Sequence, residues 1–414
     1  MARSRSVASC LCAGAAILAL VAGCNGPDAL EAWPATLVIR SAGSQVALIG
    51  STVNDPPAVQ LLDSDGKPIA DAKITFRVTG GGGNVTGGVA TTGSDGVARV
   101  GAWAVTPGLN GVTASIPAPF RVPPLPFAAT GVAAAYHIDL SYVTTVSASR
   151  QAVFTAAAAR WEQLIYGDVR DFSLILPDSA CFDAQPAINR AIDDLLILVI
   201  LDSIDGPGAI LGAAGPCVIR PPADNRLPLM GAMIFDTADV AMLESAGLFD
   251  EVILHEMGHV LGYGTIWSLQ GLLVGPAGSG GTDPHFIGAN AVAAFDRIGG
   301  TSYTGGVKVP VEGMGGPGTA DAHWREAVFG NELMTGFINS GVANPLSVVT
   351  VASQGDEGYL VNYAAADLYT HAFSAAARVP AQGTGATIAL GNDVLWAPIY
   401  TVDPQGRVTG VFRR

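Results

Sequence analysis

The residues with the clearest capacity for chemistry lie in the stretch 250–264, which contains the pattern His-Glu-x-x-His. On a helix, His255 and His259 are one turn apart, so both imidazoles leave the same face and can bind one metal ion. Glu256 lies beside them, placed to accept a proton from a water molecule at that ion. This spacing is the signature of zinc metallopeptidases. The alternative is a helix with two surface histidines that bind no metal ion.

A zinc site that activates water needs a third protein ligand and an open fourth position. Gly262 follows the apolar-periodic run and is expected to end the helix. A compact form of this motif has its third histidine three residues beyond that glycine, but the residue there is Thr265. The third ligand must therefore come from farther along the chain. The candidates are Glu312, Glu326, Glu332, His285, His323 and His371.

The segment 321–336 favours His323 as this ligand. His323 is followed by Trp324 and then by the order Glu-Leu-Met-Thr, in which the methionine is Met334. Together with the His-Glu-x-x-His-x-x-Gly motif, this order resembles leishmanolysin and its bacterial relatives, which are zinc metallopeptidases of the metzincin class. The resemblance covers residues 136–414 and implies an α+β peptidase fold of the metzincin type.

The same resemblance implies roles for individual residues. An insertion would split the metal motif after the helix, and His323 would complete a three-histidine site for one catalytic Zn²⁺ with His255 and His259. Glu256 would be the general base toward the attacking water. Met334 would lie in a turn beneath the metal, as a structural residue that does not bind it.

Other residues of the peptidase part are weaker candidates. His285 lies in the glycine-rich insertion and is the main rival ligand; otherwise we expect it to contact substrate. His371 falls in a helical pattern over 364–376 and is interpreted as structural. No tyrosine closely follows Met334, so no tyrosine ligand or oxyanion-stabilising tyrosine is expected there.

Local patterns also predict the elements that hold the site. An unbroken apolar run at 195–201 predicts a buried central strand. Residues 151–166 have an apolar stripe at helical spacing, and 249–261 predict the metal-binding helix. Residues 230–236 predict an edge strand along the cleft, where extended substrate can pair. The glycine-rich stretch 206–217 is interpreted as a structural loop.

The stretch 35–132 has a different pattern, with short runs rich in Val, Ile and Thr between turn-forming residues. Several short strands in this length predict an all-β sandwich. The order of its turns, its strand at 73–78 and its run of four glycines at 80–83 resembles the bacterial immunoglobulin-like repeats of invasin- and intimin-type surface proteins. That resemblance implies a spacer or an adhesion module.

The first residues indicate export. Arg3 and Arg5 precede an apolar stretch at 11–22 that is too short to span a bilayer. The order Leu-Val-Ala-Gly-Cys ending at Cys24 resembles a bacterial lipobox, which implies a lipoprotein signal peptide over 1–23, a lipidated Cys24 and a tether over 24–34. Lipidation would anchor the protein in the cell envelope, at the outer membrane or cell surface. An ordinary signal peptide is the alternative.

Composition narrows the classes of partner. The 414-residue chain is 49% hydrophobic and carries a formal charge of −14, which argues against nucleic acid or an anionic membrane surface as the main partner. No feature of the sequence indicates an oligomeric state. Once Cys24 and the signal are set aside, Cys181 and Cys217 are left, and in an exported chain this pair predicts a disulfide.

These features together predict a multidomain, exported, lipid-anchored zinc endopeptidase. Its peptidase domain would span 136–414, follow an immunoglobulin-like domain at 35–132, and act on protein or peptide substrates. The main alternative is a surface adhesion or scaffold protein with a non-catalytic metal site. A third possibility is a zinc hydrolase that acts on a non-peptide amide.

Overall fold

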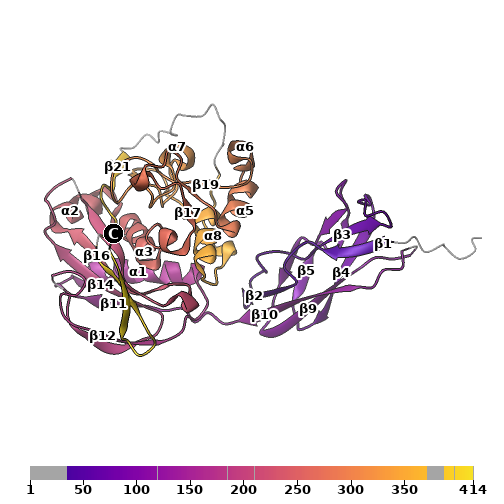
Figure 1. The fold of residues 1–414 in the computed structure, drawn as a ribbon, viewed down its shortest axis with the longest axis horizontal. Helices are drawn as coiled ribbons and strands as arrows, with labels where there is room; N and C mark the ends of the chain where they lie inside the picture. The colour runs from indigo at the N-terminus through magenta and orange to yellow at the C-terminus, as the bar shows by residue number, and fades with distance from the viewer. Residues whose placement is uncertain are drawn as a thin grey trace, which may run out of the picture.

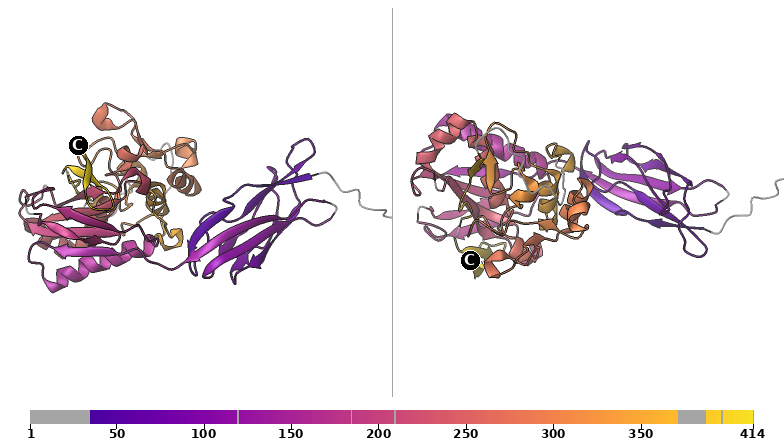
Figure 2. Two further views of the ribbon diagram at one scale, coloured as in Figure 1. Left: turned by 60° about the horizontal axis from the view of Figure 1, so that its bottom comes forward. Right: turned by 90° about the horizontal axis from the view of Figure 1, so that it is seen from above.

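The computed structural model describes residues 35–118, 120–183, 185–208, 210–370, 387–395 and 397–413. They form an elongated arrangement of two parts, joined after the last strand of the N-terminal part (Figures 1 and 2). The predicted signal peptide and tether, with Cys24, lie outside the described residues, as does His371. Among the residues that are described, no helix is long and apolar enough to cross a membrane.

The N-terminal part is a β-sandwich. Its sheets have the strand orders β1-β3-β7 and β2-β10-β9-β4-β6, with a small β5-β8 pair. Buried residues of both large sheets, such as Leu61 and Phe76, belong to one apolar cluster. The strands are β1 (Ala35–Ile39), β2 (Ser44–Leu48), β3 (Ala58–Asp63), β4 (Lys73–Gly80), β5 (Asn84–Thr86), β6 (Val89–Thr91), β7 (Val97–Arg99), β8 (Ala102–Ala104), β9 (Gly108–Ser115) and β10 (Leu125–Val132).

A six-stranded sheet is the centre of the C-terminal part, with the order β11-β14-β16-β15-β22-β23. The predicted central strand is confirmed as β14, which pairs in parallel with β11 and β16. Its alternate side chains enter two different apolar clusters, which explains the unbroken apolar run. The strands are β11 (Ile138–Tyr142), β14 (Leu195–Asp202), β15 (Gly212–Ile219), β16 (Pro228–Asp236), β22 (Ile399–Val402) and β23 (Val408–Phe412).

Two helices, α1 (Ala148–Leu164) and α3 (Phe249–Leu261), pack against each other and against this sheet. The Ser147 hydroxyl caps α1 at the amide of Arg150, so the helix begins before the predicted residue 151. Trp161 of α1 donates its indole N–H to the carbonyl of Leu254, 3.0 Å away, and so fixes the metal-motif helix against the core. The helix predicted at 249–261 is confirmed with those bounds.

Two sequence predictions about the sheet are wrong. The strand predicted at the edge, now β16, lies inside the sheet between β14 and β15. The predicted loop at 206–217 contains most of β15, which runs antiparallel to β16. The residues of β15 (Gly-Ala-Ala-Gly-Pro-Cys-Val-Ile) lack an alternating apolar pattern, so this strand is specified by its pairing rather than by its own sequence. A disulfide joins Cys217 of β15 to Cys181.

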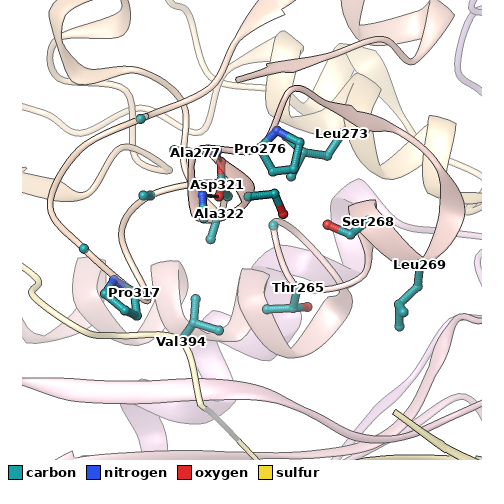
Figure 3. Close-up of a pocket in the computed structure, with 17 residues that line it drawn as sticks. Thr265, Ser268, Leu269, Leu273, Pro276, Ala277, Pro317, Asp321, Ala322 and Val394 are labelled. Atoms are coloured by element: carbon teal, nitrogen blue, oxygen red, sulfur yellow. Dashed lines mark hydrogen bonds between the residues drawn. The ribbon is translucent and has the colours of Figure 1, made fainter. Parts of the chain in front are cut away.

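The remaining elements surround this core. Between α3 and His323, the predicted insertion folds into short elements that line most of an open cavity of about 750 Å³ (Figure 3). The predicted helix at 364–376 is wrong over 366–370, where no helix forms, and its end lies outside the described residues. The elements are β12 (Phe172–Leu176), β13 (Ile188–Ile192), α2 (Thr237–Ala246), α4 (Trp267–Gln270), β17 (Leu273–Val274), β18 (His285–Phe286), α5 (Ala289–Arg297), α6 (Thr301–Thr304), β19 (Val309–Pro310), α7 (Glu326–Phe329), β20 (Phe337–Asn339), α8 (Val348–Glu357) and β21 (Thr387–Ala389), with 3₁₀ turns at Pro222–Asp224, Ala277–Ser279 and Tyr363–Ala365.

Asp236 connects the sheet to the loop that follows β14, and it offers a first prediction. Its buried carboxylate caps α2 at Ala238 and accepts the backbone N–H groups of residues 204–206. Burial raises its pKa, but these four donors outweigh burial and hold the pKa at about 2. We expect Asp236→Ala to reduce the free energy of unfolding by about 2 kcal/mol.

The same carboxylate predicts a pH dependence. Because its folded-state pKa lies below the ordinary value, its contribution is complete above about pH 4 and is lost as the pH falls through about 2. Urea unfolding at several pH values measures this. Asp202→Ala, an exposed position paired with Asp236 in the sheet, is the matched control and should change the unfolding free energy by less than about 0.5 kcal/mol. Equal effects of the two substitutions would contradict the prediction.

Candidate metal centre

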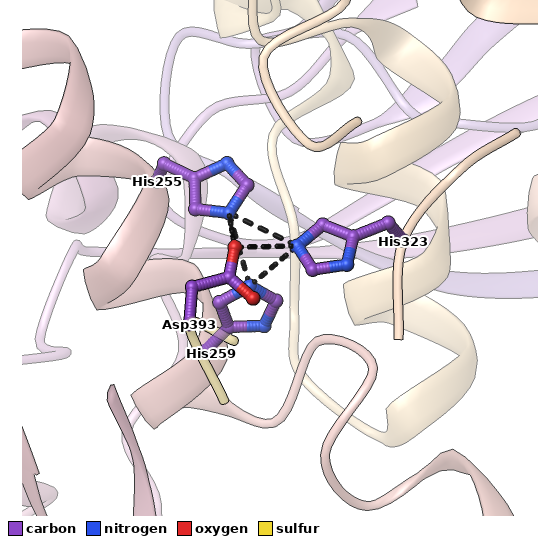
Figure 4. Close-up of side chains that lie close together, drawn as sticks. All are labelled: His255, His259, His323 and Asp393. Carbon is purple, nitrogen blue, oxygen red and sulfur yellow. Dashed lines mark hydrogen bonds and ion pairs between the residues drawn. The ribbon is translucent and has the colours of Figure 1, made fainter. Parts of the chain in front are cut away.

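Three buried imidazoles meet at one point in the C-terminal part (Figure 4). His255 and His259 project from α3, and His323 comes from the segment that follows the insertion. The Nε2 atom of His259 lies 3.0 Å from the Nε2 atoms of both other histidines, and those of His255 and His323 are 3.2 Å apart. The helix with His255 and His259 and the distant segment with His323 are therefore neighbours in space.

The outer nitrogen of each ring is bound to the backbone. The Nδ1 atoms of His255, His259 and His323 lie 2.7, 2.9 and 3.0 Å from the carbonyl oxygens of Leu333, Tyr263 and Thr319. A carbonyl can only accept, so each Nδ1 carries the proton and each Nε2 presents a lone pair to the centre.

Three lone pairs that face one another in a buried space repel unless a cation lies between them. Tetrahedral zinc, with Zn–N bonds of about 2.0–2.1 Å, separates its nitrogen ligands by about 3.3 Å. The distances between the three Nε2 atoms are close to this value. The donor set therefore fits a zinc ion.

The helix end at Gly262 brings the third histidine into place. Gly262 has φ of 120° and ends α3, and the hydroxyl of Thr265 donates to the carbonyl of His259 at 2.8 Å. Tyr263 then links the two halves: its hydroxyl accepts the N–H of Trp324 and donates to the carbonyl of Met334. Trp324 stacks on Trp267 and Phe329 in an aromatic cluster. The residue after His323 is thus fixed by packing as well as by hydrogen bonds.

Met334 lies directly against the metal-motif helix. A Cβ atom built on Gly258 would lie 2.8 Å from its Cε atom and 3.1 Å from its Sδ atom. The buried carboxylate of Glu332 accepts the N–H groups of Met334 and Ser347 and the hydroxyl of Thr350, which fixes this turn. Met334 therefore supports the helix from below. Both carboxylate oxygens of Glu332 accept hydrogen bonds within this part of the chain.

The other rival ligands also lie away from the cluster. His285 is in β18, and its Nδ1 contacts the carbonyl of Asp283 at 2.7 Å. Glu312 accepts the amides of Gly313 and Met314. Among the described residues, one group containing histidine is arranged to hold a metal ion, and neither His285 nor any of the three candidate glutamates belongs to it.

Sequence reasoning missed one member of this group. The Oδ2 atom of Asp393 lies 3.1 Å from Nε2 of His323 and 3.4 Å from Nε2 of His255, and its side chain is fully buried (Figure 4). Asp393 is not part of any sequence motif with the spacing of metal ligands. The one local signal is an acidic residue between Leu390 and the apolar pair Val394 and Leu395.

Burial and mutual charge set the protonation of the cluster. Burial lowers the pKa of His255 although the Asp393 carboxylate opposes this. Burial, and next the imidazoles of His323 and His255, lower the pKa of His259 well below its ordinary value. Burial alone would lower the pKa of His323, but the Asp393 carboxylate reverses this and raises it. Although burial opposes ionisation of Asp393, the three histidines hold its pKa well below the usual range. Asp393 is therefore the anionic member of the group.

Glu256 is the remaining ionisable residue at the centre. Burial, and then the charge of Asp393, raise the pKa of its carboxyl group well above the ordinary value. Neither of its carboxylate oxygens has a hydrogen-bond partner among the described residues, although the side chain is fully buried. An unpaired buried carboxyl group costs free energy, so a fold retains one where it serves another purpose.

The cavity drawn in Figure 3 is lined in part by residues that are close in sequence to the metal-binding residues. Three such residues line it. Thr265 comes shortly after the metal-motif helix, Ala322 comes directly before His323, and Val394 comes directly after Asp393. Its other side chains are mainly small or apolar, including Leu269, Leu273, Pro276 and Pro317. The space can accept a small apolar group next to the metal-binding residues.

A second prediction concerns the turn that positions His323. Gly264 has φ of 71°, and a Cβ atom there would lie 2.1 Å from the carbonyl oxygen of Ala322. Gly264→Ala must therefore displace the residue before His323. We expect it to lower the free energy of unfolding by about 1–3 kcal/mol more than Gly271→Ala and to reduce zinc content.

Gly271 is the matched control for this change. It has φ of 73°, but a Cβ atom there would have nothing within 4 Å. Gly271→Ala therefore carries the backbone strain without the collision. Urea unfolding and zinc content by elemental analysis measure both variants, and equal results would contradict the proposed steric link between Gly264 and His323.

Comparison with known proteins agrees with the site. Residues 190–379 match the family model of leishmanolysin, a peptidase family. That range includes His255, His259, His323 and Met334 and ends before Asp393. No curated protein matches the chain.

Similarity to solved structures is slight. The D00-D0 domain of Intimin is 17% identical over 22% of this chain and 45% of that chain, with a TM-score of 0.18. A Beta-Glucuronidase of Parabacteroides merdae is 19% identical over 25% of this chain and 12% of that chain, with a TM-score of 0.18. This chain thus spans less than half of the intimin chain that it matches, and neither likeness supports an argument about fold or function.

Proposed function

We propose that this protein is an exported zinc endopeptidase that hydrolyses peptide bonds in proteins or peptides. The observation that carries the proposal is the buried Glu256 carboxyl group, which has no hydrogen-bond partner among the described residues and follows His255 in the helix that carries two of the three converging histidines. The match of residues 190–379 to the leishmanolysin model supports it. An immunoglobulin-like identity for the sandwich and a metzincin type for the peptidase fold belong to the same proposal.

His255, His259 and His323 would hold the zinc, and their Nδ1 hydrogen bonds keep the Nε2 lone pairs aimed at it. The bound ion would polarise the scissile carbonyl and make a water molecule a better nucleophile. Glu256 takes the proton of the attacking water and passes it to the leaving amine, which releases two peptides. Met334 keeps the helix that carries these groups in position.

One observation favours a second candidate, a metal site without catalysis. Structural zinc sites have four protein ligands, whereas catalytic sites leave one position open. Asp393 lies where it can complete such a closed set. A structural site, however, would gain nothing from Glu256, whose buried carboxyl group has no partner in the part of the chain that the structure describes and therefore costs free energy. The peptidase is therefore the better supported function.

Chelator-sensitive proteolysis tests the proposal. The purified protein should cleave casein or a peptide library, lose activity in 1,10-phenanthroline and regain it with added zinc. Cleavage-site profiling should show apolar side chains beside the scissile bond, because the adjoining cavity is mainly apolar. Absence of cleavage by the zinc-loaded wild type and by the Asp393→Ala protein would overturn the peptidase proposal.

We also propose that Cys24 anchors the protein in the cell envelope; the lipobox-like order ending at this residue supports this. Cys24→Ser is expected to abolish incorporation of labelled fatty acid and move the protein out of the membrane fraction, because acyl chains supply the attachment. Cys12→Ser, inside the predicted signal, is the control and should keep both properties. An unlabelled wild-type protein would overturn the anchoring.

A further inference from the structure

The chain crosses the metal centre in residues 387–395, which we name the strap. At its start, β21 pairs antiparallel with β20, the strand that follows Met334. The amide of Leu390 then donates to the carbonyl of Gly336 at 3.1 Å, and the hydroxyl of Thr319 donates to the carbonyl of Gly391. The first half of the strap is thus bound to the segment that carries His323 and Met334.

The second half of the strap is bound to the opposite side of the centre. The amide of Ala214 in β15 donates to the carbonyl of Asp393 at 2.7 Å, and the amide of Leu395 donates to the carbonyl of Ala214 at 2.8 Å. Val394 therefore pairs with Ala214 in a parallel bridge. Asp393 lies between these two attachments, with its carboxylate against His323 and His255.

The backbone pairing with β15 and the oxygen atom at the histidines are the two interactions that an extended peptide substrate would need. A peptide commonly binds to an enzyme by adding a strand to an exposed sheet edge. Hydrolysis also requires a peptide oxygen at the open position of the zinc. The strap pairs with β15 at Ala214, before the part of β15 that pairs with β22, and places a carboxylate oxygen at the histidine cluster.

The burial of the centre supports the same interpretation. His255, Glu256, His259, His323 and Asp393 are all 0% exposed. The strap contributes to this burial, because its Asp393 carboxylate lies against His255 and His323. The three histidines and Glu256 are all in place, but they are buried from solvent.

We propose that the strap occupies the substrate cleft as an internal pseudo-substrate, with Asp393 as the fourth metal ligand, so that the folded chain is a latent peptidase. This inference rests on the proposed function. Opening exchanges the carboxylate of Asp393 for a water molecule and frees the amide and carbonyl of Ala214 for substrate. Asp393 acts here as a masking ligand and takes no part in hydrolysis.

Access of an external ligand to the metal tests the strap without measuring catalysis. The wild type, Asp393→Ala and the isosteric Asp393→Asn are loaded with Co²⁺, and acetohydroxamate binding is followed by the visible absorption of the metal. A strap that is closed about 99% of the time weakens apparent binding about 100-fold. We therefore expect both variants to bind acetohydroxamate about 100-fold more tightly than the wild type. Asp178→Ala, at an exposed aspartate of the C-terminal part, is the control and should bind as the wild type does.

Casein cleavage by the zinc-loaded proteins then separates the strap from the proposed function. Tighter hydroxamate binding with faster cleavage supports both. Tighter binding without cleavage supports the strap and overturns the peptidase. Equal binding by the wild type and both variants overturns the strap, whatever the rate of cleavage. Loss of cobalt from both variants while they remain folded also overturns it, because Asp393 would then be an essential ligand of a closed structural site.

Discussion

Glu256→Gln is expected to leave zinc bound and to lower kcat for peptide hydrolysis by about 1,000-fold, the scale of a general-base contribution. Glutamine has nearly the same shape but cannot accept the proton of the attacking water. Over the ranges that the structure describes, the Glu256 carboxyl group has no hydrogen-bond partner to lose, so its replacement by a neutral group should also keep or increase the free energy of unfolding. Lower activity with equal or higher stability is the distinctive result.

The rate should be measured both in the wild type and in the Asp393→Ala protein, so that a closed strap does not hide the effect. Asp250→Asn is the matched control, since it removes an exposed carboxylate from the first turn of the same helix. This control should keep kcat within a factor of about two, because surface substitutions have small effects. Peptidase activity that persists in Glu256→Gln would contradict the assigned base.

The metal-motif helix could be predicted from sequence because all of its signals are local. His255 and His259 are one turn apart, the apolar residues repeat at helical spacing, and Gly262 stops the pattern. The structure gives the helix the expected bounds. The central strand was equally predictable, because both of its faces are buried and its sequence is apolar throughout.

β15 and Asp393 could not be predicted in this way, because each depends on distant parts of the chain. β15 contains glycine, alanine and proline, and it is a strand because β16 supplies its hydrogen-bond partners. Asp393 reaches the cluster because the strap pairs with Ala214, which is far away in the sequence. No spacing rule relates an aspartate at 393 to a histidine at 255.

His323 was an intermediate case, and its replacement gives the second large effect. His323→Ala removes one of three converging Nε2 atoms, so we expect zinc affinity to fall by at least about 100-fold, the scale seen when ligand shells are damaged. Zinc at about 1,000 times its Kd stabilises a folded protein by about 4 kcal/mol. The variant should therefore lose most of the zinc-dependent rise in Tm that the wild type shows.

His285→Ala is the matched control for this variant, because His285 also has its Nδ1 atom against a backbone carbonyl but lies outside the cluster. It should keep wild-type zinc affinity in competition with a chromogenic chelator. Zinc loss in His285→Ala with tight binding in His323→Ala would contradict the assignment.

Asp393 determines how much zinc affinity should remain in His323→Ala. His255, His259 and Asp393 still form a set of two imidazoles and one carboxylate, which is itself a known way to bind zinc. Residual affinity is therefore expected in the single variant, and it should disappear in His323→Ala/Asp393→Ala. If Asp393 is a ligand, its removal must cost more affinity when His323 is absent than when three histidines remain. Additive losses would mean that Asp393 and His323 contribute to the site independently.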